Sequence, residues 1–103
     1  MKTKPLVLMH PGELVRVEFI ESLGLSVAGV ARATGIPQPS LAQMMNGRRA
    51  LSPESCLRLA RYFGVDPQWF MNLQAHYDLR QAEKRIARSV ASIKPMVTSA
   101  AAT

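Results

Sequence analysis

The apolar residues of this chain recur at helical spacing, and no stretch alternates apolar and polar residues as a half-buried strand does. Val15, Phe19 and Leu23 form a stripe spaced by four residues, which predicts a first helix with one buried face. That helix is expected to begin at the His10-Pro11-Gly12-Glu13 segment and to end at Gly24. The pattern therefore predicts an all-α fold.

Cap residues and glycines divide the rest of the chain into four further helices. Each is expected to begin at a serine, a proline pair or an Asp-Pro step and, except for the last, to stop at a glycine. The predicted helices cover about 27–34, 38–46, 53–63 and 67–90. The side chains of these helices that we expect in the core are Val30, Ala31, Leu41, Met44, Met45, Cys56, Leu57, Ala60 and Phe63.

The chain is long enough for one compact domain and too short for two. We expect an N-terminal extension over 1–9, a folded domain over 10–90 and a flexible tail over 91–103. The run of four apolar residues near the N-terminus is shorter than the ~7–15-residue core of a signal peptide. No stretch approaches the ~20 apolar residues of a membrane span. Both observations predict a cytoplasmic protein.

Catalysis and metal binding are not indicated. Cys56 is the single cysteine, so an internal disulfide is excluded, and only His10 and His76 accompany it as possible zinc ligands. His76 could pair with Asp78 or Glu83, but no nucleophile falls at a suitable spacing. We therefore expect no cofactor, no structural metal and no enzymatic activity. Cys56 itself is interpreted as an inert buried thiol.

The net charge of +6 and the isoelectric point near 10.3 favour a polyanionic partner, and nucleic acid is the first candidate. The positive charge falls in two zones, 22–65 and 80–94, which an acidic segment over 66–79 separates. The second zone is consistent with a solvated helix face, extra phosphate contacts or a patch for a protein partner.

Two short predicted helices, 27–34 and 38–46, are joined by a tight turn, which is the spacing of a helix-turn-helix. In the second helix Gln38, Ser40 and Gln43 point away from the apolar side. Amide and hydroxyl groups in that position can reach base edges or phosphates in a major groove. The first basic zone therefore contains a candidate DNA-reading helix.

Arginines near this helix have two alternative roles. Arg48 and Arg49 follow it directly, where they can neutralise phosphates without reading sequence or can cap the helix C-terminus. Arg32, Arg58 and Arg61 are interpreted as ordinary solvated charges.

Several segments of the chain resemble those of lambda-repressor-like helix-turn-helix domains and, among these, of the HigA-type antitoxins of bacterial toxin–antitoxin pairs. Together they span about residues 9–85. The Pro-Gly-Glu opening and the Trp-x-x-Asn-Leu-Gln segment are the more specific to HigA, whereas Asn-Gly is shared by many repressors. The segments are His10-Pro11-Gly12-Glu13, Leu23-Gly24-Leu25-Ser26, Asn46-Gly47-Arg48-Arg49, Leu51-Ser52-Pro53-Glu54, Leu57-Arg58-Leu59-Ala60, Trp69-Phe70-Met71-Asn72-Leu73-Gln74 and Tyr77-Asp78-Leu79.

The resemblance implies a compact five-helix DNA-binding domain with an extended C-terminal helix. It also implies a homodimer that binds a palindromic operator in its own promoter, and a HigB-like ribonuclease toxin as the partner that it silences. We expect dimer contacts from the last helix, where Trp69, Leu73 and Tyr77 exceed what so small a core needs. The residues placed by the resemblance at bases or phosphates are Gln38, Pro39, Ser40 and Gln43, and those near the DNA backbone are Asn46, Arg48 and Arg49.

Two positions depart from the family pattern. Val27 stands where relatives often have a glutamine that helps to hold a phosphate, and Pro39 stands where a polar base-reading residue is common. A rival hypothesis is therefore a toxin-binding interaction module with degenerate DNA binding. A third is a stand-alone phage-type transcriptional regulator, which would share every DNA-binding residue.

Overall fold

The computed structural model of the protein describes residues 9–96, which form helices with no strand among them. The first predicted helix is present as two consecutive pieces, α1 (Pro11–Val15) and the π-helical η2 (Arg16–Glu21). The others are α2 (Val27–Thr34), α3 (Gln38–Met45), α4 (Pro53–Phe63) and α5 (Pro67–Ala91). The predicted all-α fold is confirmed. The extension expected over 1–9 and the tail expected over 91–103 lie mostly outside the described residues.

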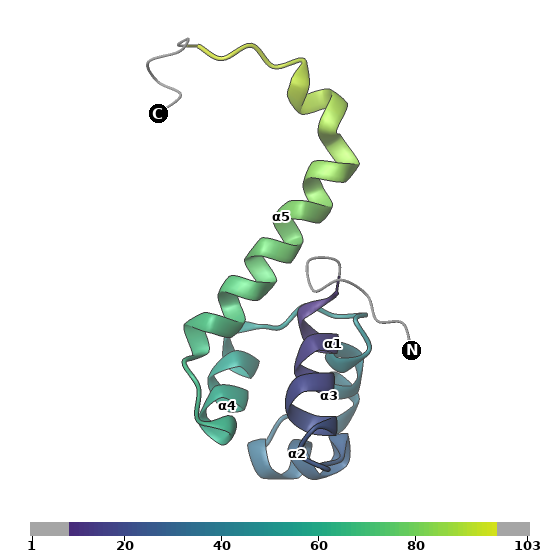
Figure 1. Ribbon diagram of the computed structural model, residues 1–103, viewed down its shortest axis with the longest axis vertical. Helices are drawn as coiled ribbons and strands as arrows, with labels where there is room; N and C mark the ends of the chain where they lie inside the picture. The colour runs from purple at the N-terminus through teal and green to yellow at the C-terminus, as the bar shows by residue number, and fades with distance from the viewer. Residues whose placement is uncertain (1–8, 97–103) are drawn as a thin grey trace.

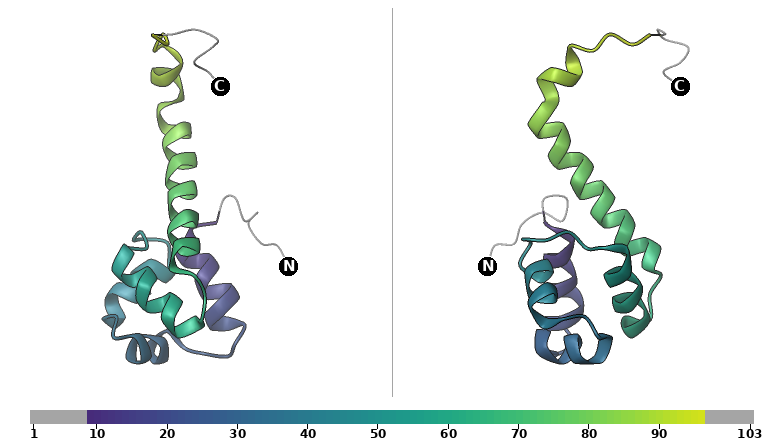
Figure 2. Two further views of the ribbon diagram at one scale, coloured as in Figure 1. Left: turned by 90° about the vertical axis from the view of Figure 1, so that its left-hand side faces the viewer. Right: turned by 180° about the vertical axis from the view of Figure 1, so that it is seen from behind.

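The helices α1 to α4 pack into one body, and α5 begins against that body and then extends beyond it (Figure 1). Two further views agree that only the first part of α5 lies beside the other helices (Figure 2). The extension accounts for the long envelope of 52 × 30 × 21 Å. At Ile86 the backbone has φ −121° and ψ 25°, non-helical values that kink the extending part. Helix α3 therefore packs within the body, mainly against α1 and α2.

The core lies where α1, η2, α2, α3, α4 and the first turns of α5 meet. Its fully buried side chains include Val15, Ile20, Val30, Leu41, Met45, Leu59 and Phe70. At its edge Phe19 contacts the rings of Phe63 and Phe70, with ring centroids 5.0 and 5.7 Å apart. Aromatic pairs of this geometry contribute about 0.5–1.5 kcal/mol each beyond their burial. This cluster attaches α5 to η2 and α4.

Leu23 does not continue the buried stripe of the first helix, as was expected, because it is 63% exposed. The stretch Arg16–Glu21 is π-helical, and the Ser22 N–H accordingly donates to the carbonyl oxygen of Val17, five residues earlier, at 3.2 Å. The wider π turn inserts about one residue, so a spacing of four no longer returns to the same face. Ile20, which is 1% exposed, occupies the buried position instead.

The prediction that Leu57 lies in the core is also wrong. Leu57 is 60% exposed, whereas Leu59 is fully buried. On α4 the residues at i, i+3, i+4 and i+7 from Cys56 share one face, and these positions include Leu59, Ala60 and Phe63. Leu57 lies about 100° around the helix from Cys56 and so faces outward.

The predicted helix starts and stops are confirmed at α2, α4 and α5. The side chains of Ser26, Ser52 and Asp66 each accept a backbone N–H of the helix that they precede. Gly35 and Gly64 end α2 and α4 with φ values of 79° and 74°, which favour glycine. In the part of the chain that the structure describes, no helix is both long and apolar enough to cross a membrane.

Candidate nucleic-acid interface

The connection between α2 and α3 is held by hydrogen bonds at its first residues. The Thr34 hydroxyl donates to the carbonyl oxygen of Val30 at 2.7 Å and accepts the N–H of Ile36 at 3.3 Å. Ile36 is 5% exposed, so its side chain anchors the turn in the core. Two short helices joined in this way keep a fixed relative orientation, which a groove-reading helix requires.

Arg58 of α4 braces the same turn. Its Nη1 donates to the carbonyl oxygen of Thr34 at 2.9 Å, and its Nε donates to the Glu54 carboxylate at 3.1 Å. Arg58 is exposed, as expected of a solvated charge, but its guanidinium has a structural role as well, because it satisfies a carbonyl at the C-terminus of α2 that the helix leaves free. Glu54 is paired as well, and it is the one carboxylate in the basic zone 22–65.

The side chains of α3 divide as the sequence predicts. The apolar residues Leu41, Met44 and Met45 are buried. Pro39 and Gln43 are one helical turn apart and therefore share a face. The predicted base-reading residues, which we call the polar tip of α3, are Gln38, Pro39 and Gln43, all exposed, and the half-buried Ser40.

A hydrogen-bonded turn ends α3 and begins the loop over 46–51, which we call the arginine loop. The Gly47 N–H donates to the carbonyl oxygen of Met44 at 3.1 Å, and the Arg48 N–H donates to that of Gln43 at 2.9 Å. These are the two bonds of a Schellman motif. Backbone groups rather than arginine side chains therefore close this helix.

The predicted backbone-contacting residues Asn46, Arg48 and Arg49 are all exposed in the arginine loop. Within residues 9–96 neither guanidinium of the loop is paired with a carboxylate. A hollow of about 220 Å³ is lined by Arg49 of the loop and Ser40 of the polar tip, and Ser52 contributes a second hydroxyl group to its lining. The surface beside the polar tip is therefore polar and positively charged, which attracts phosphates.

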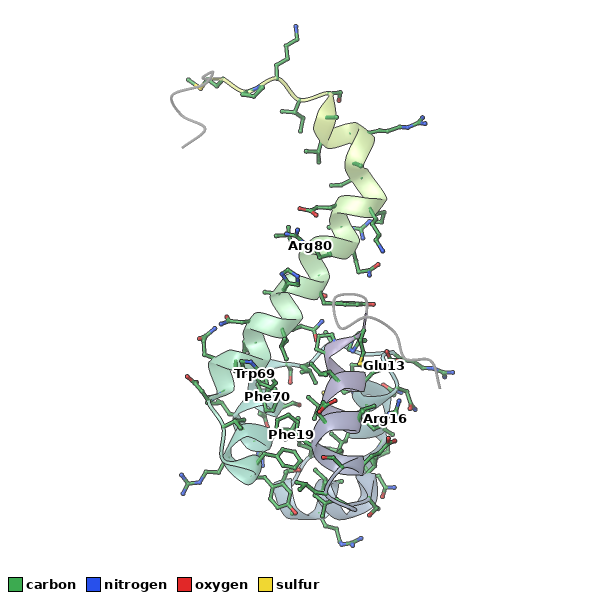
Figure 3. All side chains as sticks on the ribbon, in the orientation of Figure 1. Glu13, Arg16, Phe19, Trp69, Phe70 and Arg80 are labelled. Carbon is green, nitrogen blue, oxygen red and sulfur yellow. The ribbon has the colours of Figure 1, made fainter. Side chains whose placement is uncertain are left out.

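The first turn of α1 packs directly against the C-terminal end of α3. A side chain at Gly12 would overlap the carbonyl group of Met44, so the two backbones are in contact there. Arg16, on the side of α1 and η2 that faces α3, donates its Nε to the carbonyl oxygen of Met45 at 3.2 Å (Figure 3). His10 caps α1 by accepting the N–H of Gly12 at 2.9 Å. The sequence signal for this contact was a glycine in the first turn of the predicted helix, because a glycine allows a close approach of two backbones.

The first half of α5 makes a further contact that sequence reasoning missed. Gln74 is 4% exposed, and its Oε1 accepts the N–H of Leu51, at the end of the arginine loop, at 2.8 Å. Its Nε2 donates to the carboxylate of Asp78 at 2.9 Å. The available signal was a glutamine four residues after Phe70 on the inward face of α5, where a polar side chain needs a partner.

Residues 18–70 match the model of the helix-turn-helix family. The chain belongs to this helix-turn-helix family. Virulence-associated protein I of Dichelobacter nodosus is 36% identical over 92 residues, which cover 89% of this chain and 84% of that protein. Such a match extends well beyond the helix-turn-helix itself.

Two solved structures of similar proteins share the fold. Pseudomonas aeruginosa antitoxin HigA, solved with the higBA promoter, has a TM-score of 0.83 and 33% identity, covering 87% of this chain and 99% of that chain. Antitoxin GraA in complex with its operator has a TM-score of 0.81 and 32% identity, covering 95% of this chain and 97% of that chain. The predicted resemblance to HigA-type antitoxins and related helix-turn-helix regulators is confirmed.

The single cysteine and His76 lie outside the helix-turn-helix, on α4 and α5. Cys56 is fully buried, and desolvation raises the pKa of its thiol to about 11, so the thiol stays protonated at neutral pH. This confirms the interpretation of a buried thiol. His76 is exposed on α5. Among the described residues, no three His, Cys, Asp or Glu side chains gather as a metal site would require.

The predicted dimer residues of this helix-turn-helix protein lie on α5 but differ in exposure. Trp69 is 43% exposed, and its ring contacts that of Phe19 with centroids 6.0 Å apart (Figure 3). Leu73 is half-buried against the core. Tyr77 is half-buried too, with its ring centroid 5.0 Å from that of His10. A dimer role for the three stays a prediction, and Trp69 keeps the most free surface.

Proposed function

We propose that this protein is a sequence-specific transcriptional repressor and the antitoxin of a HigBA-type toxin–antitoxin pair. It binds an operator in its own promoter in the cytoplasm, and it binds and neutralises a HigB-like ribonuclease toxin. The observation that carries the proposal is the exposed polar tip of α3, followed at once by exposed arginines, on a frame that α1, α4 and α5 fix. The similarity to antitoxins HigA and GraA, solved with promoter or operator DNA, supports it.

The polar tip contacts the bases when α3 enters the major groove. Gln38 and Gln43 carry amides that can donate and accept toward one base at the same time, and each good bidentate pair discriminates by ~1–3 kcal/mol. Ser40 adds a hydroxyl group, and Pro39 adds an apolar contact. Because Pro39 cannot read a base by hydrogen bonds, specificity rests mainly on the two glutamines.

The arginine loop contacts the phosphates. Asn46, Arg48 and Arg49 are exposed immediately after α3, so they face the DNA backbone when the polar tip faces the bases. Each phosphate that an arginine neutralises releases condensed counterions, which contributes about −0.9 to the slope of log K against log salt. These contacts set the register of α3 without reading sequence.

A homodimer places two copies of α3 in successive major grooves, ~34 Å apart along the DNA, and its two-fold symmetry requires a palindromic operator. We assign the dimer contact to α5, through Trp69, Leu73 and Tyr77. Leu79 and Ile86 on the same helix are 54% and 42% exposed, and this apolar surface also suits coverage by a second copy.

Titrations of labelled DNA test the base-reading assignment. The probes are the duplex upstream of the protein's own gene and a scrambled duplex of the same composition. Gln43→Ala should reduce the preference for the upstream duplex by roughly 5- to 150-fold. Arg48→Ala should weaken binding to both duplexes alike and make the salt slope shallower by about 1. Unchanged affinities of Gln43→Ala for both duplexes would sink the base-reading assignment.

Co-expression with the product of the adjacent gene tests the antitoxin assignment. The expected result is a complex with a small ribonuclease whose RNA cleavage stops on binding. Sequence-specific DNA binding without such a partner would favour a stand-alone regulator. A toxin complex without any DNA sequence preference would favour an interaction module, with Val27 and Pro39 as the sites where DNA binding has degenerated.

A further inference from the structure

Gln74 connects α5 to the arginine loop but lies outside the DNA-binding surface. Its side chain is 4% exposed and lies one turn after the fully buried Phe70. A buried side-chain amide is costly unless its polar atoms find partners. The partners of this amide therefore show what its burial achieves.

The amide of Gln74 is oriented by Asp78. A carboxylate only accepts hydrogen bonds, so Asp78 takes the Nε2 donor at 2.9 Å. The oxygen Oε1 is thereby directed at Leu51, whose N–H it accepts at 2.8 Å. The three groups form a chain that runs from the backbone of the arginine loop to the surface of α5.

The arginine loop is anchored at both of its ends. At the first end, the Schellman bonds of Gly47 and Arg48 tie it to α3. At the second end, the Leu51 side chain is 2% exposed in the core and the Leu51 N–H is bonded to Gln74. Arg49 lies between the two anchors, and Arg48 lies at the edge of the first, both with exposed side chains.

We propose that Gln74 is a positioning residue for operator binding. It holds the second end of the arginine loop so that Arg48 and Arg49 present their guanidinium groups to phosphates, and it does not itself touch DNA. A loop that is ordered before binding loses less conformational entropy when the complex forms. The inference rests on the phosphate-contacting role proposed above for the two arginines.

Two variants with the net charge of the wild type isolate the hydrogen bonds. Gln74→Met keeps the length of the side chain and removes both bonds. Gln74→Glu combined with Asp78→Asn exchanges donor and acceptor, because the new carboxylate accepts from Leu51 and from the new amide. Cys56→Ala is the control for lost stability, since it leaves a small cavity in the core and Cys56 takes no part in these hydrogen bonds.

Fluorescence anisotropy measures binding of the upstream and scrambled duplexes over a salt series, at a temperature where circular dichroism shows every variant folded. Gln74→Met should weaken binding to both duplexes by about tenfold at ~0.15 M salt and make the salt slope shallower by one to two. The exchanged pair should recover wild-type affinity to within about twofold. Cys56→Ala should bind as the wild type does.

Two further measurements connect the effect to the loop. Hydrogen exchange of the Leu51 N–H should be faster in Gln74→Met and should return to the wild-type rate in the exchanged pair. When Arg48→Ala and Arg49→Ala are already present, adding Gln74→Met should cause no further loss of affinity.

Wild-type affinity and slope in Gln74→Met would overturn the inference, as would weak binding by the exchanged pair. A loss that persists without both arginines would also overturn it. A different result belongs to the proposed function: if the two arginine substitutions leave binding unchanged, the phosphate role itself is wrong. Hydrogen exchange of Leu51 then still shows whether Gln74 orders the loop.

Discussion

Replacing Gly12 by alanine tests the contact that fixes α3 within the body. The new methyl group would lie 2.6 Å from the carbonyl carbon of Met44, whereas Cβ contacts under 3.0 Å essentially never occur. The helices α1 and α3 must therefore separate. Separation strains or breaks the hydrogen bond of 3.2 Å from Arg16 to the carbonyl oxygen of Met45.

The expected change in the free energy of unfolding is the sum of three contributions. Overpacking against backbone destabilises by about 1–3 kcal/mol, and a hydrogen bond from a charged donor contributes about 1.5–3 kcal/mol. Alanine offsets up to ~1 kcal/mol through its better helix propensity. The free energy of unfolding should therefore fall by about 3 kcal/mol, which corresponds to a Tm lower by roughly 12–24 °C for a domain of this size.

Urea unfolding followed by circular dichroism measures this change. Gly29→Ala in α2 is the matched control, because its new methyl group would lie 3.1 Å from the Ser26 hydroxyl, which can adjust. That substitution should change the free energy of unfolding by less than about 1 kcal/mol. If Gly12→Ala and Gly29→Ala unfold at the same urea concentration, the close contact between α1 and α3 does not position α3.

Other substitutions test which face of α4 is buried, the hydrogen bond of Arg58 to the turn of the helix-turn-helix, and the buried thiol. Leu59→Ala should lower the free energy of unfolding by about 2–5 kcal/mol, and Leu57→Ala should lower it by less than about 1 kcal/mol. Equal losses of this free energy in urea unfolding would contradict the assignment of Leu59 to the buried face of α4 and Leu57 to the exposed face. Arg58→Met should lower the free energy of unfolding by about 1–2 kcal/mol and weaken operator binding, because it leaves the carbonyl of Thr34 without its hydrogen bond. An unchanged Tm and an unchanged operator affinity would show that this hydrogen bond is dispensable. Iodoacetamide at about pH 8 should not label Cys56 in the folded protein, and rapid labelling would contradict its burial. The unfolded thiol ionises near its ordinary pKa of 9.0 while the folded one keeps its proton to about 11, so the free energy of unfolding should fall across that range relative to Cys56→Ala.

Helix ends were predictable because caps act over a few residues. Ser26 and Ser52 accept N–H groups three residues later, and Gly35 ends α2 in the left-handed conformation that glycine adopts most readily. The apolar side of α3 was predictable for the same reason, since a helical period identifies it. Leu23 was not, because nothing in the local pattern distinguishes a π turn from an α turn.

Contacts between distant parts of the chain account for what the sequence did not show. Arg58 meets Thr34 across 24 residues, and Gln74 meets Leu51 across 23. Local periodicity carries no information about such pairs, so Arg58 was interpreted as solvated and Gln74 only as part of a family motif. The exposed side of α3 that carries the polar tip was predictable because its residues follow one another on a short helix. The residues that hold the arginine loop and the turn were found only in the structure.

The ratio of two affinities tests the central claim most directly. Wild-type protein is titrated at ~0.15 M salt into the duplex upstream of its own gene and into a scrambled duplex of equal length and composition. A sequence-specific repressor should bind the upstream duplex at least about 10³-fold more tightly. A ratio near one would contradict the account, because the positive surface alone would then explain all of the DNA binding.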